Sequence, residues 1–73
     1  MQVGLFRLSM QTMLNCHLEY TNLTKEVAKD VYLAKALTAL QEAESVDSNN
    51  LQVLEARSKH FYMASERSLR RWH

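Results

Sequence analysis

The chain contains no proline and only one glycine, Gly4, among its 73 residues. Glycine and proline are the strongest helix breakers, costing about 1 and about 3 kcal/mol relative to alanine in a helix interior. Alanine, leucine, glutamate, glutamine, lysine, arginine and methionine, which favour helix, dominate many windows of the sequence. The sequence therefore predicts an all-α fold, an antiparallel helical hairpin with a shorter N-terminal helix.

Two polar clusters divide the chain into segments. Tyr20-Thr21-Asn22 and Val46-Asp47-Ser48-Asn49-Asn50 are rich in residues that favour turns. Seventy-three residues are enough for one domain at most. We therefore expect a single helical domain over 1–73, with helices over about 5–18, 23–45 and 50–72.

Side chains at the two turns are suited to capping helices. We expect Thr21 or Asn22 to cap the second helix, because a side-chain oxygen there can accept a hydrogen bond from a free backbone amide. Asn49, with Gln52 three residues later, has the form of a capping box, and Asn50 is an alternative cap for the third helix. A five-residue connection suits two antiparallel helices.

The clearest pattern in the sequence is an apolar stripe on the third helix. Its members are three or four residues apart over about six turns, which is close to the spacing of a coiled-coil seam. Ser58 and Ser65 interrupt the stripe and allow a facing helix to approach closely. The pattern predicts that the second and third helices form the hairpin. The predicted seam residues are Leu33, Leu37 and Leu40 on the second helix, and Leu51, Leu54, Phe61, Leu69 and Trp72 on the third.

Two further apolar faces remain outside this seam. One lies on the first helix and contains two methionines, which suit an adaptable surface. The other is a fainter stripe on the third helix. The candidate partner-binding residues are Phe6, Met10, Met13 and Leu14 on the first helix, and Val53, His60 and Met63 on the third. The alternative is that the first helix folds back onto the fainter stripe and closes a three-helix bundle.

Residues that catalyse reactions or bind metals are scattered along the sequence. His17, His60 and His73 lie in different regions, with Cys16 beside the first, whereas zinc sites need three or four closely spaced ligands. Glycine-rich phosphate loops and paired-carboxylate motifs are absent from the sequence. We therefore expect no enzymatic activity, no cofactor and no metal.

The N-terminal stretch has some features of a signal peptide, but Arg7 and the polar Gln11 and Thr12 interrupt its apolar residues. No apolar run reaches the roughly 18 residues of a membrane span. A single cysteine fits a reducing compartment. We expect no membrane span and a cytoplasmic location.

Charge is distributed unevenly along the chain. Residues 1–56 carry four basic and seven acidic groups, a net −3, whereas residues 57–73 carry five basic groups and one acidic group, a net +4. A basic helix with an interleaved aromatic residue is typical of nucleic-acid binding. Cations at a helix C-terminus also complement the helix dipole, which is the simpler explanation. A small nucleic-acid-associated regulator is therefore an alternative function.

The small core is the main reason to expect a partner. A single core of this size supplies only a few kcal/mol of stability, and small scaffolds usually add disulfides, a metal or an oligomeric partner. One cysteine cannot form an internal disulfide. We therefore expect a non-enzymatic protein-interaction module that binds a helical partner through its apolar faces. A self-assembling helical homodimer is a further alternative.

One stretch of the sequence resembles the junction between tetratricopeptide repeats. In that family an alanine- and leucine-rich helix is followed by a turn that commonly reads Asp-Pro-Asn-Asn. The matching residues here are Ala36, Leu37, Leu40 and Ala43, then Val46-Asp47-Ser48-Asn49-Asn50, and Leu54. Ser48 takes the place of the proline, and the 34-residue period of a repeat array is absent.

By length and layout, residues 17–73 also resemble the small co-chaperones of type III secretion needle subunits. The matching features are Leu18-Glu19, Leu37 and Leu40, the polar turn, and the aromatic-ended final helix through Trp72. Those bacterial proteins have a short N-terminal helix and a long antiparallel helical hairpin. They pair with a tetratricopeptide-like chaperone and help to keep the needle subunit from polymerising prematurely. The resemblance implies a chaperone or adaptor role for this chain.

Overall fold

The computed structural model describes residues 3–71, which form three α-helices: α1 (Val3–Asn22), α2 (Glu26–Val46) and α3 (Leu51–Arg71). These residues contain no strand, so the predicted all-α class is confirmed. α1 extends beyond the expected range 5–18 at both ends and, at 20 residues, is nearly as long as the 21-residue α2 and α3. The break expected at Tyr20-Thr21-Asn22 comes slightly later, because Thr21 and Asn22 are still helical.

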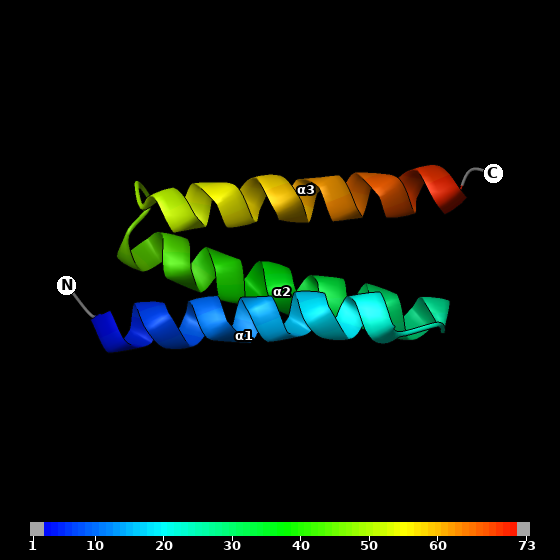
Figure 1. Ribbon diagram of the computed structural model, residues 1–73, viewed down its shortest axis with the longest axis horizontal. Helices are drawn as coiled ribbons and strands as arrows, with labels where there is room; N and C mark the ends of the chain where they lie inside the picture. The colour runs from blue at the N-terminus through cyan, green and yellow to red at the C-terminus, as the bar shows by residue number, and fades with distance from the viewer. Residues whose placement is uncertain (1–2, 72–73) are drawn as a thin grey trace.

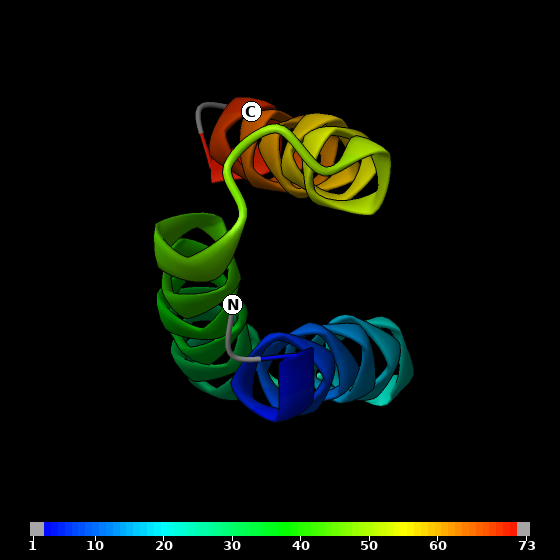
Figure 2. The same ribbon diagram turned by 90° about the vertical axis from the view of Figure 1, so that its left-hand side faces the viewer.

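The three helices form an elongated body of 43 × 18 × 14 Å. α1 and α3 run in the same direction, and α2 runs antiparallel to both (Figure 1). Seen end-on, the helices form a C, in which α1 and α3 both pack on α2 and the open side lies between α1 and α3 (Figure 2). α1 and α2 approach each other closely along their length, whereas α3 is close to α2 at fewer positions. α2 and α3 form an antiparallel hairpin, as predicted, but α1 and α2 form a second and tighter one.

Small side chains explain why α1 and α2 lie so close together. Ala36, Ala39 and Ala43 are buried at spacings of three and four residues, so they present a smooth stripe on one face of α2. Ala39 lies beside Cys16 of α1, which is also buried. At one end of this interface, the Ser9 hydroxyl of α1 donates a hydrogen bond to Glu42 Oε2, at 3.3 Å.

The buried face of α3 is the fainter of its two stripes. It comprises Val53, Ala56, His60, Met63 and Arg67. By contrast, Leu51, Phe61 and Leu69 are 69%, 65% and 61% exposed, and Leu54 is also exposed. These four residues therefore do not form the predicted intramolecular seam, and we call them the outer ridge of α3. Trp72, the last predicted seam residue, lies outside the described residues.

The two α3 stripes lie on nearly opposite sides of the helix. Leu51, Leu54 and Phe61 are each followed two residues later by a buried residue, as Leu51 is by Val53, and two residues correspond to about 200° around a helix. Of the α2 seam residues, Leu40 is buried, Leu33 is half-buried and Leu37 is exposed. α3 is thus rotated by about half a turn from the orientation that its larger apolar residues favour.

The helix caps differ between the two turns. Thr21 and Asn22 do not cap α2, which corrects the prediction: Lys25 occupies the N-cap position without a side-chain hydrogen bond. The Thr21 hydroxyl instead donates to the Leu18 carbonyl, at 2.7 Å. At α3, Asn50 Oδ1 accepts a hydrogen bond from the Gln52 amide, at 2.8 Å, so the alternative cap is the one in use.

Replacing Asn50 with alanine is expected to lower the free energy of unfolding by about 1 kcal/mol, because an amide at the start of α3 loses its acceptor. Urea unfolding followed by circular dichroism measures this change. Asn49→Ala is the matched control and is expected to change stability by no more than a few tenths of a kcal/mol. If the larger loss came from Asn49→Ala, the capping-box alternative would be the correct one.

Candidate functional site: a groove between α1 and α3

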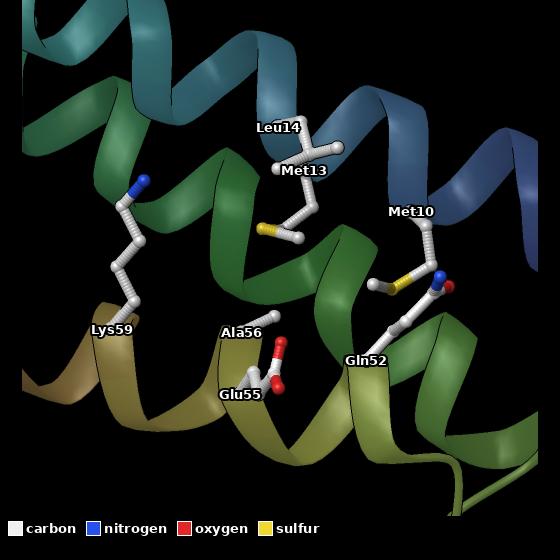
Figure 3. A pocket seen from close by; sticks show the side chains of 7 residues that line it. All are labelled: Met10, Met13, Leu14, Gln52, Glu55, Ala56 and Lys59. Atoms are coloured by element: carbon white, nitrogen blue, oxygen red, sulfur yellow. The ribbon is translucent and has the colours of Figure 1, made fainter.

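An apolar groove of about 330 Å³ lies between α1 and α3, on the open side of the C (Figure 3). Its lining comes from one face of each helix: Met10, Met13 and Leu14 of α1, and Gln52, Glu55, Ala56 and Lys59 of α3. A neighbouring hollow shares Met10, Leu14 and Gln52 and continues along α1 to Phe6. The two hollows together form one groove, which we call the α1–α3 groove.

The floor and the rim of the α1–α3 groove differ in chemistry. The Met10 and Met13 side chains extend from α1 toward α3 and are buried, so flexible apolar thioethers form much of the floor. Leu14 is exposed at the α1 edge. On α3, Glu55 and Lys59 are exposed and four residues apart, which places opposite charges on the same helix face. An apolar floor with a charged rim is suited to an amphipathic helix.

The candidate partner-binding residues separate into two groups in the structure. Phe6, Met10, Met13 and Leu14 all line the α1–α3 groove. Val53, His60 and Met63 are buried against the other helices, so they do not form a free surface in this conformation. Of the four first-helix residues, Leu14 is exposed and Phe6 is half-buried, whereas Met10 and Met13 are as buried as the three residues of the third helix.

A buried pair of histidines joins α1 to α3. His17 Nε2 and His60 Nδ1 are 2.9 Å apart and share a hydrogen bond. The two rings are stacked, with centroids 5.2 Å apart, and the residues are only 3% and 7% exposed. The two residues are 43 positions apart in the sequence, so no local pattern could have shown that they meet.

The surroundings keep both rings neutral. Burial lowers the pKa of His17 to about 4, and the nearby His60 and the positive charge of Lys59 contribute to this change. Burial also lowers the pKa of His60. Within the described residues, His17 Nδ1 is buried and has no hydrogen-bond partner.

Arginines of α3 pair with carboxylates in the described part of the chain. Arg67 is the most buried of them, and its guanidinium binds both Asp30 and Glu26 of α2. Arg57 pairs with Glu44 of α2. Arg70 Nη2 lies 3.8 Å from Oε1 of Glu66, one turn earlier on α3. These pairs leave less free positive charge for phosphate contacts than the sequence alone indicates.

The described residues contain no group of three or more histidine, cysteine, aspartate or glutamate side chains placed to hold a metal ion. Cys16, next to His17 in sequence, is buried near Ala39 of α2.

Within residues 3–71, no helix combines the length and the apolar character that crossing a bilayer requires.

Comparison with protein families, with curated proteins and with solved structures gives no match for this chain. The geometry of the α1–α3 groove is therefore the basis for a functional proposal.

Proposed function

We propose that the protein is a non-enzymatic adaptor that binds an amphipathic helix of a partner protein in the α1–α3 groove. The observation that carries this proposal is the open side of the C, where Met10, Met13 and Leu14 form an apolar strip between two parallel helices. A fourth helix placed there would contact α1 and α3 together and complete a four-helix bundle.

The dimensions of the groove set the kind of helix that fits. The α1 side extends from Phe6 to Leu14, which is about two helical turns and about 12 Å. A partner helix would fill it with apolar residues at i, i+3 or i+4, and i+7. Glu55 and Lys59 on the α3 rim would favour a partner with complementary charges beside its apolar stripe.

The resemblance to type III secretion co-chaperones gives this proposal a specific form. In that form the partner is a tetratricopeptide-like chaperone or a needle subunit. The polar turn between α2 and α3 matches the layout of that family, whereas α1, at 20 residues, is longer than the short N-terminal helix of those proteins. Binding of the purified chain to these two proteins, measured by calorimetry, tests it directly.

A photo-crosslinking amino acid placed at position 14 is expected to join the chain to a helical segment of a partner, because Leu14 lies at the exposed edge of the groove. The same probe at position 8 is the control, since Leu8 is an exposed leucine of α1 that does not line the groove. Leu14→Glu is expected to weaken partner binding by about tenfold or more, and Leu8→Glu by less than about twofold.

Equal cross-linking from positions 8 and 14 would contradict binding in the groove. Cross-links from position 14 to a second copy of the chain would instead support the homodimer alternative. Salt-dependent binding to nucleic acid, lost on replacing Arg70, would support the nucleic-acid alternative.

A further inference from the structure

We propose that the His17–His60 pair is a pH-sensitive latch, which holds α3 against α1 while both rings are neutral and releases α3 when either ring takes up a proton. Among the side chains of residues 3–70, this is the only hydrogen bond that joins α1 to α3. The inference concerns the free protein and requires no partner.

Only one proton can lie between the two facing nitrogens, His17 Nε2 and His60 Nδ1. In the favoured tautomer, His17 Nε2 donates to His60 Nδ1, and the unpartnered His17 Nδ1 carries a lone pair. The opposite tautomer would place an N–H group at that buried site, and an unpaired buried donor is costly. The neutral pair therefore has a single good arrangement.

An additional proton destabilises the closed pair, whichever ring receives it. Protonation of His60 at Nδ1 would bring two N–H groups face to face and remove the hydrogen bond. Protonation of His17 at Nδ1 would create a buried charge and a buried donor without a partner. In both cases the free energy of the protein falls when α3 moves away from α1, because water then reaches the rings.

The charges around the pair oppose protonation. On α3, Lys59 is the residue next to His60; it adds positive charge near His17 and also lines the α1–α3 groove. On α1, Glu19 is exposed and two residues from His17, which points it to another side of the helix.

α2 supplies no free compensating charge on its side of the pair. It presents Leu37, Leu40 and Gln41 beside His60. The carboxylate that α2 contributes to that side is Glu44, which is already paired with Arg57.

The fold makes α3 the element that moves. α1 and α2 are in close contact over their length, whereas α3 approaches α2 at fewer positions. Ion pairs of Arg67 with Glu26 and Asp30, and of Arg57 with Glu44, would keep α3 attached to α2 during the movement. Release of the latch therefore widens the space between α1 and α3 and exposes their inner faces without separating α1 from α2.

The pH range follows from the pKa values of the two states. In the open state the histidines meet water and have a pKa of about 6.5, whereas that of His17 in the closed state is about 4. The open state therefore binds protons first as the pH falls, so the closed state loses stability between about pH 6.5 and about pH 4. For His17 alone, the opening equilibrium constant is expected to rise by about 30-fold between pH 7.5 and pH 5.

Thiol labelling of an Ala56→Cys variant measures this opening. Ala56 is only 9% exposed beside Met10 and Met13 at the α1–α3 groove, so a thiol there is expected to react slowly with a small disulfide reagent until α3 moves. The native Cys16, buried between α1 and α2, serves as an internal control. Rates at each thiol, normalised to those of the unfolded chain at the same pH, are obtained by mass spectrometry of the digested protein.

The expected result is a rise of about 30-fold in normalised labelling at position 56 between pH 7.5 and pH 5, with little change at Cys16. In a His17→Gln/His60→Gln background this rise is expected to disappear. Equal increases at both thiols, a rise that persists without the histidines, or no rise at all would overturn the proposal. If the cysteine variant does not fold, the test is a pH titration of the histidine NMR resonances of the unaltered chain. Titration of both His17 and His60 near pH 6.5 would overturn the latch. Titration of the two rings at lower pH, each dependent on the other, would support it.

Discussion

Replacing Leu40 with alanine is expected to lower the free energy of unfolding by about 2–5 kcal/mol. Leu40 is 1% exposed and belongs to the core cluster that α1, α2 and α3 share. The change removes most of a buried side chain and leaves a cavity that rigid neighbouring helices cannot fill completely. Because a domain of this size has a total stability of only about 4–11 kcal/mol, the change is expected to remove a large share of it. Urea unfolding at neutral pH measures the change.

The matched control for Leu40→Ala is Leu69→Ala. Leu69 is on the outer ridge and 61% exposed, so its truncation is expected to change the free energy of unfolding by less than about 0.5 kcal/mol. The sequence pattern alone places both leucines in one seam and predicts similar losses. Equal destabilisation by the two variants would therefore contradict the orientation of α3 described above.

The sequence predicts the helices well because their determinants are local. The near absence of glycine and proline and the polar cluster before Leu51 are visible in short windows. The Asn50 cap could also be named in advance, because its partner amide is only two residues away. The C-terminal end of α1 was harder to predict, since Thr21 and Asn22 favour turns but also tolerate a final helical turn.

The orientation of α3 could not be read from apolar periodicity. Its larger apolar residues, such as Phe61 and Leu69, form the outer ridge, whereas Val53, Ala56 and Met63 face the core. Both stripes have helical spacing, so the period does not distinguish them. The deciding contacts are polar and distant in sequence: His60 meets His17, and Arg67 meets carboxylates of α2.

The candidate site was predicted in part. Phe6, Met10, Met13 and Leu14 were identified as a surface from their spacing, and all four line the α1–α3 groove. The α3 half of the groove was missed, because Gln52, Glu55 and Lys59 have polar or charged side chains that look like an ordinary solvated face. Such residues become part of a site only when another helix lies beside them.

Replacing Arg67 with methionine is expected to lower the free energy of unfolding by about 1–3 kcal/mol. Arg67 Nε donates to Asp30 Oδ1 and Nη2 donates to the Glu26 carbonyl, each at 2.6 Å, and the guanidinium also pairs with the Glu26 carboxylate. Methionine keeps much of the buried aliphatic stem but none of these donors. The carboxylates of Glu26 and Asp30 are partly exposed, so water will replace some of the lost interaction and place the loss in the lower half of this range.

The control for Arg67→Met is Arg70→Met, at a neighbouring arginine whose side chain is 78% exposed. Its pairing with Glu66 spans a single helical turn, and its loss is expected to cost less than about 0.5 kcal/mol. The two variants remove the same charge and add the same side chain. A difference between them therefore reports the buried contacts with α2, and equal small effects would show that Arg67 does not hold α3 in place.

Arg67→Lys separates the role of charge from the role of geometry. Lysine retains the positive charge, but its single ammonium group cannot reproduce the spread of donors by which the guanidinium reaches a carboxylate and a backbone carbonyl together. We therefore expect Arg67→Lys to recover less than about half of the stability lost in Arg67→Met. Full recovery would show that charge alone matters, in which case about 1 M salt should also abolish most of the wild-type contribution. Because the Arg67 side chain is only 8% exposed, we expect that contribution to persist in salt, with α3 held to α2 chiefly by directed hydrogen bonds.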